Sequence, residues 1–242
     1  MQSSRAIVLH QIKYSETSLI LKIYTEKEGL LSFIVKGVRG KRGRLRTAQF
    51  QPLNVVDLTY RKNKKSPLRI IQDLKITEPF KNLFFHPIKR AIAIFLVELI
   101  QNSIKEEEPN KEMFEFLYTS IYWLDLTDKI INCFHLLFMM KLTKHLGFYP
   151  RESTSGKEKF FDLQEGVFLQ QKPLHPHYLD GEVLEQWEHL ISCRFEEIAG
   201  LKIPINQKRI LVQALMDYYK LHLNYFKELN SHQILQTVFS DE

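Results

Sequence analysis

The chain has 242 residues, 44% of them hydrophobic and 26% charged, which is typical of a folded globular protein and not of a disordered one. Its longest apolar run, 91–97, is far shorter than the ~20 residues that a membrane-spanning helix needs. The net charge of +6 is unevenly placed: residues 1–80 hold 16 Lys and Arg against 6 Asp and Glu, and the remainder is mildly acidic, so a polyanionic partner is expected for the first part alone.

The first 80 residues are predicted to form strands. Short runs rich in β-branched and aromatic residues, separated by turn residues, lie at 6–14, 19–25, 31–36, 53–60 and 68–77. Leu31, Phe33 and Val35 show the period of two that is expected of a half-buried strand. Five short strands with one long basic loop predict a small barrel or sandwich, and the OB-fold is the five-stranded barrel that binds oligonucleotides.

From residue 81 the pattern becomes helical. Helices are predicted at 87–103, at 111–124 with Asn110 as the cap, and at 129–146, where Gly147 ends the helix. Further helices are predicted at 181–198, at 206–226 with Asn206 as the cap, and at 231–238. Between them, 151–178 is irregular and contains a hairpin at 160–168 that turns at Gly166. The prediction is thus an α+β chain, with one domain at 1–80 and a helical domain at 81–242.

Two basic clusters lie at the ends of predicted strands. The first spans residues 36–46 and holds three glycines and no acid, and the second follows one strand later. Their cations are Lys36, Arg39, Lys41, Arg42, Arg44, Arg46, Arg61, Lys62, Lys64 and Lys65. Most charge runs are only solvated surface, but clustered cations on one face are the footprint of nucleic-acid binding. We predict that the two clusters line one groove and contact phosphates without regard to sequence.

Aromatic side chains of the same unit are candidates for base stacking. Tyr14, Tyr24 and Tyr60 lie in or beside predicted strands, and exposed aromatics on a basic face can stack unpaired bases. A small barrel also buries aromatics, and the polar tip of a tyrosine suits either place. Both readings stay open for the three tyrosines, whereas Phe33 is assigned to the core.

No catalytic or metal site is predicted. The sequence has no GxSxG and no GxxxxGK[ST], and its carboxylates Asp57, Asp73 and Asp162 are scattered singly. His175 and His177 flank a proline without the further ligands that a structural zinc site needs, so they are interpreted as loop residues. The two cysteines form no CxxC pair and are expected to be reduced, which favours a cytoplasmic protein. No cofactor is expected.

Six short segments, in order, resemble the RecO family of bacterial recombination mediators. Four are in the strand-rich part and two in the helical part, so the resemblance spans almost the whole chain. They are Ser15–Leu19 (SETSL), Tyr24–Leu30 (YTEKEGL), Val35–Arg42 (VKGVRGKR), Gln51–Leu53 (QPL), His145–Pro150 (HLGFYP) and Asn230–Leu235 (NSHQIL).

The resemblance implies an N-terminal OB-fold that binds single- and double-stranded DNA and anneals complementary strands. It further implies action with RecR and single-strand-binding protein (SSB) to load the RecA recombinase, in the cytoplasm at the nucleoid. The helical domain in this family docks the acidic, hydrophobic C-terminal tail of SSB. Lys141, Lys144 and His145, at the end of an apolar helix, are candidates for that contact, although cations at a helix end also compensate its dipole.

One departure from the family concerns metal. Many RecO proteins carry a four-cysteine zinc module after the LGY-x-P segment, but this chain has no cysteine between Pro150 and Asp180. The hairpin at 160–168 is expected to occupy that place without zinc.

Three other functions are weighed against DNA repair. An RNA-binding OB-fold protein of translation would prefer RNA over single-stranded DNA. A nuclease or other DNA-processing enzyme would turn over DNA with a metal, and the lack of clustered carboxylates speaks against it. A pure interaction scaffold would bind no nucleic acid at low salt.

Overall fold

The computed structural model describes the chain except for residues 39–46, 63–65, 130, 154–155 and 241–242. Its internal contacts divide the chain into two compact units. The barrel unit comprises Met1–Lys89 and Leu99–Leu126, and the helical unit comprises Arg90–Glu98 and Thr127–Glu242. Residues of one long helix, α1 (Pro87–Ser103), therefore belong to both units.

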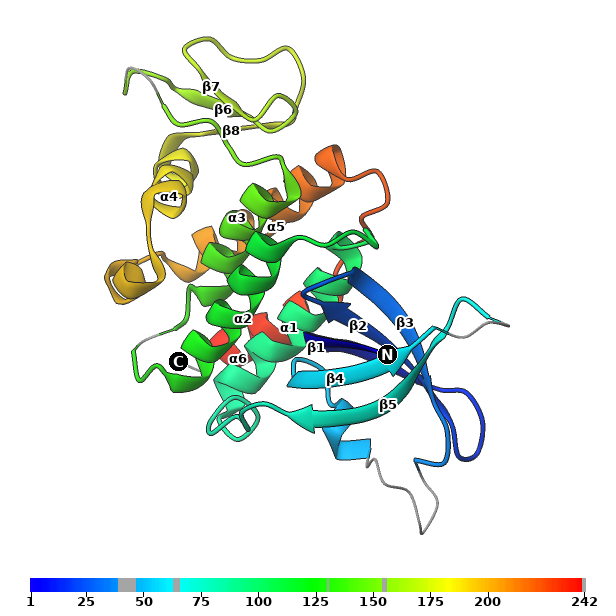
Figure 1. Ribbon diagram of the computed structural model, residues 1–242. Helices are drawn as coiled ribbons and strands as arrows, with labels where there is room; N and C mark the ends of the chain where they lie inside the picture. The colour runs from blue at the N-terminus through cyan, green and yellow to red at the C-terminus, as the bar shows by residue number, and fades with distance from the viewer. Residues whose placement is uncertain (39–46, 63–65, 130, 154–155, 241–242) are drawn as a thin grey trace. The chain divides into compact units, whose positions relative to one another are not determined.

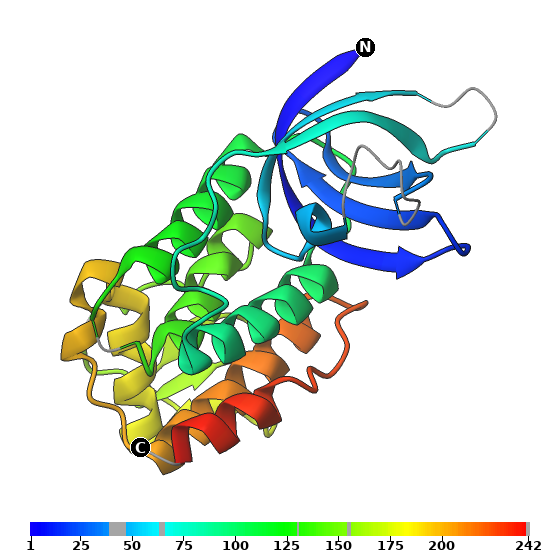
Figure 2. The same cartoon turned by 90° about the horizontal axis from the view of Figure 1, so that it is seen from below.

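Five strands of the barrel unit close into a barrel, visible in Figure 1 and, from below, in Figure 2. The strands are β1 (Gln2–Lys13), β2 (Leu19–Thr25), β3 (Gly29–Val35), β4 (Val55–Arg61) and β5 (Arg69–Ile76). Their order around the barrel is β1-β2-β3-β5-β4, with β4 pairing back onto β1. All pairs are antiparallel except β3–β5. This is the five-stranded OB-fold, as predicted.

Alternating apolar side chains fill the barrel. In β3, Leu31, Phe33 and Val35 are buried and the residues between them are half-buried, which confirms the predicted period of two. Phe33 meets Tyr60 edge to face inside the barrel, with ring centroids 5.3 Å apart. A short 3₁₀ helix, η1 (Thr47–Phe50), adds Phe50 to the same core.

Helix α2 (Lys111–Leu126) packs on the barrel within the same unit. Asn110 caps it, because its side-chain oxygen accepts from the Met113 N–H at 2.9 Å, as predicted. The Arg5 guanidinium, on β1, pairs with Glu26 at 3.0 Å and with Glu115 of α2. This link joins two barrel strands to the helix.

A buried carboxylate of α2 holds the connection that follows β5. Asp125 is 1% exposed and accepts backbone N–H bonds from Lys81, Asn82 and Leu83 at 2.7–3.0 Å. Three amides that have no strand partner, among them that of buried Leu83, are thereby satisfied.

The helical unit is built around α3 (Phe134–Leu146), which is buried along most of its length. Its other elements are α4 (Gly181–Ser192), η2 (Phe195–Gly200), α5 (Ile205–His222), α6 (His232–Ser240) and a three-stranded sheet in the order β7-β6-β8. Gly147 ends α3 with φ of 88°, as the sequence predicts, because this left-handed backbone favours glycine. No helix in the described ranges is long and apolar enough to span a bilayer.

The small sheet confirms the predicted hairpin. Strands β6 (Phe160–Asp162) and β7 (Val167–Leu169) pair around a turn in which Gly166 has φ of 67°. A third strand, β8 (Tyr178–Asp180), pairs with β6 and was not predicted, because three residues are too few to show a period. The aromatic ring of Phe161 packs on Trp187 of α4, 5.2 Å away, and so anchors the sheet to the helices.

Several predicted helix boundaries are wrong. Helix α3 begins at Phe134 and not at residue 129, and helix α5 ends at His222 and not at residue 226. Helix α5 begins at Ile205, and its first carbonyl acceptor is Pro204, which takes the Lys208 N–H at 2.9 Å; Asn206 therefore lies inside the first turn and is not the cap. The segment predicted as one helix at 181–198 divides into α4 and η2 at Cys193, whose backbone is extended with ψ of 145°.

Candidate nucleic-acid interface

Three cations of the two basic clusters lie in the described part of the barrel. Lys36 follows the last residue of β3, Arg61 is the last residue of β4, and Lys62 comes next; all three are exposed. The other members, Arg39, Lys41, Arg42, Arg44, Arg46, Lys64 and Lys65, lie outside the described residues.

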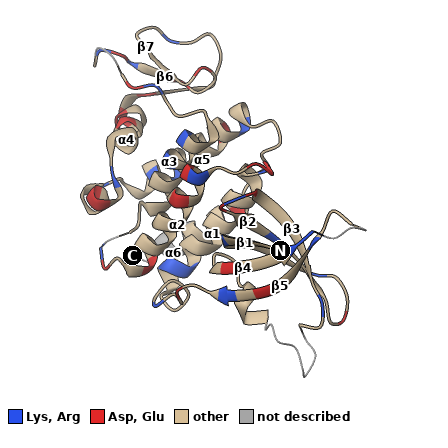
Figure 3. Cartoon of the chain, viewed as in Figure 1, with Lys and Arg blue, Asp and Glu red and all other residues tan. Residues whose placement is uncertain are grey.

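The strand register brings the starts of both clusters to one end of the barrel. Ile34, near the end of β3, pairs with Ile70 of β5, and Ile70 pairs in turn with Arg61 of β4. Lys36 directly follows β3, so the described starts of the two clusters, Lys36 and Arg61, lie at the ends of β3 and β4, on either side of β5. Lys and Arg are drawn blue in Figure 3. The arrangement suits contact with one run of phosphates.

The three candidate tyrosines lie in different environments. Tyr14, in the turn after β1, is 63% exposed and is available to stack on a base. Tyr24 and Tyr60 are only 2% and 1% exposed, so of the two readings left open for them the structure supports a place in the core and not a stacking platform. Tyr24 lies under α2, with its ring 6.4 Å from that of Phe114, and burial raises the pKa of its hydroxyl to about 12.

Tyr60 is held inside the barrel by a polar contact. Its hydroxyl donates to the Glu28 carboxylate at 2.5 Å, and the other oxygen of that carboxylate accepts from Arg69 at 2.9 Å. Burial and this hydrogen bond raise the pKa of the Tyr60 hydroxyl. Burial also raises the pKa of Glu28, but the bonds from Tyr60 and Arg69 outweigh it and hold that pKa below its usual value.

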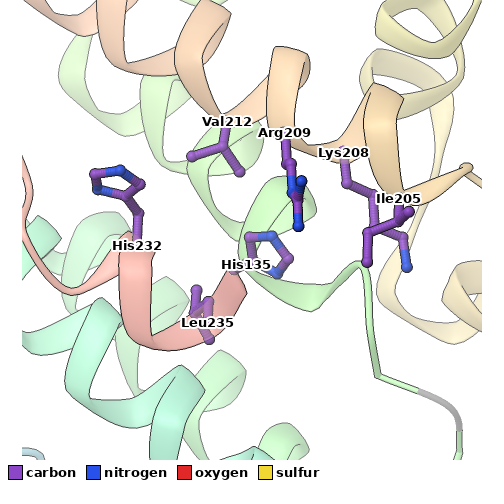
Figure 4. A pocket seen from close by; sticks show the side chains of 7 residues that line it. All are labelled: His135, Ile205, Lys208, Arg209, Val212, His232 and Leu235. Atoms are coloured by element: carbon purple, nitrogen blue, oxygen red, sulfur yellow. The ribbon is translucent and has the colours of Figure 1, made fainter. Parts of the chain in front are cut away.

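A pocket opens in the helical unit between α3, α5 and α6 (Figure 4). About 340 Å³ of empty space, part of it open to solvent, lies over an apolar floor. Val212 and Leu235 are buried in that floor, and Lys208 and Arg209 stand at its side on α5. The lining is His135, Ile205, Lys208, Arg209, Val212, His232 and Leu235.

The buried histidine of this pocket is neutral. Burial, assisted by the nearby charge of Lys208, lowers the pKa of His135 to about 3. His135 is therefore uncharged at neutral pH, and the positive charge of the pocket comes from Lys208 and Arg209. An apolar floor beside cations suits a ligand with a carboxylate and an apolar end.

The comparisons with known proteins agree over both halves of the chain. The family model for the N-terminal domain of recombination protein O matches residues 1–80, and the model for its C-terminal domain matches residues 86–230. The chain belongs to the RecO family. A protein named DNA repair protein RecO from Flavobacterium psychrophilum is 36% identical to it over 239 residues, 98% of each chain. The protein of the same name from Phocaeicola vulgatus is 33% identical over 240 residues, 99% of this chain and 100% of that relative.

In this RecO-family chain, one candidate for partner contact also has a structural role in the helical unit. The Lys141 ammonium is half-buried and donates to the Ile191 carbonyl at 2.7 Å and to the Tyr149 hydroxyl at 3.2 Å. Burial lowers its pKa. Lys141 thus ties α3 to the end of α4, whereas Lys144, which is exposed, and His145, which is half-buried, stay candidates in the last turn of α3.

The segment that contains the hairpin is held by hydrogen bonds and aromatic packing. Asp162, predicted to lie in a turn or on the surface, is 4% exposed and accepts from the N–H groups of Gln164 and Glu165. Its other oxygen lies 3.1 Å from Nε2 of His175. Among the residues that the structure describes, no three His, Cys, Asp or Glu side chains are placed to hold a metal.

Proposed function

We propose that this RecO-family chain binds single- and double-stranded DNA and anneals complementary strands without bond chemistry. The observation that carries the proposal is a closed OB-fold barrel in which the two basic clusters begin at the ends of β3 and β4, on either side of β5. It is supported by a match over 98% of the chain to a protein named DNA repair protein RecO. Annealing needs only that the electrostatic repulsion between the two strands be screened, and cations that bind phosphates do this.

The proposed contacts are chiefly to phosphate. Lys36, Arg61 and Lys62, with the cations at 39–46 and 64–65, neutralise phosphates on either strand. Arginine suits this work because its planar guanidinium binds two phosphate oxygens at once. Such contacts carry no base information, so the proposed binding tolerates any sequence. We place the DNA-binding domain at residues 1–80 and the partner-binding helical domain at 81–242.

The proposed partners are RecR, SSB and, through them, RecA. For SSB, the pocket between α3, α5 and α6 supports docking of an acidic tail with an apolar end. Val212 and Leu235 offer an apolar floor, and Lys208 and Arg209 offer cations for the acidic groups. Lys141 lies outside this pocket, and its ammonium donates to the Ile191 carbonyl and the Tyr149 hydroxyl.

Strand annealing with and without SSB tests the proposal. Complementary oligonucleotides are mixed with the protein, then with the protein and SSB-coated strands, then with SSB that lacks its tail. We expect faster pairing in the first two cases and loss of the acceleration only in the third. Absence of acceleration on bare strands would overturn the annealing function.

The cations themselves are tested by substitution. Replacing Arg39, Lys41, Arg42, Arg44 and Arg46 with alanine is expected to weaken binding of all sequences alike and to flatten the salt dependence of the affinity. An unchanged salt slope would contradict phosphate contact at this loop. Competition between RNA and single-stranded DNA of equal length separates the proposal from an RNA-binding function, and turnover of labelled DNA with a metal would indicate an enzyme.

A further inference from the structure

The C-terminal helix α6 is held at its start by a carboxylate from another helix of the helical unit. Glu98 of α1 accepts from the backbone N–H groups of Asn230 and Ser231, at 2.9 and 2.8 Å, and from the Ser231 hydroxyl. Burial raises the pKa of Glu98, but these bonds outweigh it and hold that pKa below its usual value, so the carboxylate is ionised at neutral pH. We call Glu98, Asn230 and Ser231 the Glu98 latch.

Beyond the latch, α6 buries little of its described surface. Of the side chains of α6 that the structure describes, only Leu235 is buried, and Ile234 is 44% exposed. The connection before the helix is fixed, because the ring of Phe226 lies 5.0 Å from that of Tyr219 and Leu229 is fully buried. The chain is thus anchored as far as Leu229, and the helix that follows depends on Leu235 and on the latch.

Helix α6 is one wall of the pocket in the helical unit. It supplies His232 and Leu235, and the other lining residues come from α3 and α5 (Figure 4). The 340 Å³ of empty space includes open solvent, and the cavity itself has a volume of about 20 Å³, which is room for about one water molecule. A leucine or phenylalanine side chain is several times larger than a water molecule. Such a side chain can enter only if a wall of the pocket moves.

The three walls differ in how firmly they are packed. Helix α3 is buried along most of its length, and α5 has buried residues on each turn from Gln207 to Tyr219. A close-packed core transmits any shift of such a helix to its neighbours, so moving α3 or α5 would disturb the whole unit. Moving α6 exposes Leu235 and breaks the latch, and it leaves the rest of the core in place.

We propose that α6 is a movable wall of this pocket, and that release of the Glu98 latch admits the apolar end of an acidic peptide. The entering side chain takes the position of Leu235 beside Val212, while Lys208 and Arg209 on α5 remain available to the acidic groups. The inference rests on the proposed docking of an acidic tail, and it deepens that proposal by naming what controls entry.

A movable wall and a fixed wall predict opposite effects of weakening the latch. If only the open form binds, the apparent affinity is reduced by the fraction of molecules that are open. A weaker latch raises that fraction and so strengthens binding. If α6 were a fixed wall, a weaker latch would loosen part of the binding site and so weaken binding. The sign of the change therefore decides between them.

The test uses the full chain with two latch variants and a control. Glu98→Gln removes the charge of the latch, and Ser231→Ala removes its hydroxyl donor without changing the net charge. Glu185→Gln is the control, because Glu185 is an exposed glutamate of α4 outside the pocket lining. The probes are an acidic peptide that ends in phenylalanine and the same peptide ending in glycine. Melting curves establish that each variant is folded.

The measured quantity is the preference for the phenylalanine peptide over the glycine peptide. Removing a charge at residue 98 affects both acidic peptides alike, so it cancels in this ratio. We expect Glu98→Gln to raise the preference about tenfold, because it loses hydrogen bonds to an ionised group that keep the pocket closed. Ser231→Ala should raise it by a smaller factor, and Glu185→Gln should leave it unchanged. An unchanged or lower preference in both latch variants would overturn the movable wall.

Amide hydrogen exchange provides a second measurement. Exchange at residues 230–235 should be faster in Glu98→Gln than in the wild type, and faster in the wild type once the phenylalanine peptide is bound, since the open form lacks the latch. Slower exchange on binding would show a fixed wall and overturn the inference while leaving peptide docking intact. If neither the wild type nor Glu98→Gln binds either peptide at low salt, the proposed docking fails, and the movable wall fails with it.

Discussion

The Tyr60 hydroxyl donates a 2.5 Å hydrogen bond to Glu28, and this contact defines what Tyr60 does. The ring fills the barrel beside Phe33, and the hydroxyl reaches a carboxylate that also binds Arg69. Since Glu28 lies in the turn between β2 and β3 and Arg69 begins β5, the contact joins β4 and β5 to the β2–β3 turn. Tyr60 is therefore a structural residue, although it lies one residue from the exposed cations Arg61 and Lys62.

Removing the Tyr60 hydroxyl should affect stability and leave DNA binding unchanged. Tyr60→Phe keeps the ring but deletes the donor to Glu28, so we expect the free energy of unfolding to fall by about 1–2 kcal/mol. Urea unfolding and oligonucleotide titration measure the two effects. Tyr14→Ala is the complementary variant, because Tyr14 is exposed and is a candidate for base stacking. It should weaken binding of single-stranded DNA without changing stability. A loss of DNA affinity in folded Tyr60→Phe would contradict this assignment.

The Glu28 contact also predicts a pH dependence. The pKa of Glu28 in the folded protein is lower than its ordinary value of 4.5. The folded state therefore favours the ionised form of the Glu28 carboxylate more than the unfolded state does. Its stabilising effect is fully present above pH 4.5 and is lost as the pH falls through the lower folded value. We expect the stability difference between the wild-type protein and Glu28→Gln to be constant near neutral pH and to shrink in acid. A difference that grows in acid would contradict it.

The two buried tyrosines, Tyr24 and Tyr60, show what sequence can and cannot predict here. In β4, Val56, Leu58 and Tyr60 alternate with Asp57, Thr59 and Arg61, and this period of two already places Tyr60 inside. Tyr24 is different, because its neighbours Ile23 and Thr25 are buried as well. Its cover is Phe114 of α2, about 90 residues later in the chain, and no local pattern contains that contact.

Strand and cap positions were more accessible to prediction. Asn110 and Gly147 act locally, through one side-chain oxygen and one left-handed backbone, so their roles follow from residue type and position. The pocket between α3, α5 and α6, by contrast, depends on packing between helices that are distant in the sequence.

Asp125 is expected to be among the most sensitive residues of the barrel unit. Asp125→Ala would leave the N–H groups of Lys81, Asn82 and Leu83 without their acceptor, in a site where the carboxylate is 1% exposed. A loss of about 3 kcal/mol or more in the free energy of unfolding is expected, since buried donors lose a charged partner. Asp57→Ala, at an exposed carboxylate on β4, is the comparison and should change stability by less than about 0.5 kcal/mol. Equal effects of the two substitutions would show that the Asp125 contacts do not matter.

The pocket of the helical unit gives the last prediction, which concerns a peptide partner. Arg209 is exposed at a pocket whose floor is apolar, so Arg209→Glu should place a negative charge where the acidic tail of SSB is proposed to lie. We expect at least about a tenfold loss of affinity for a peptide of that tail, through like-charge repulsion. Arg151→Glu makes the same charge change at an exposed residue outside the pocket lining, and it should bind the peptide as the wild type does. Raising the salt concentration should weaken wild-type binding, while replacing the apolar end of the peptide should weaken binding to both variants and the wild type alike. If Arg209→Glu and Arg151→Glu bind equally well, the tail lies elsewhere, and Lys144→Glu in the last turn of α3 becomes the variant to measure.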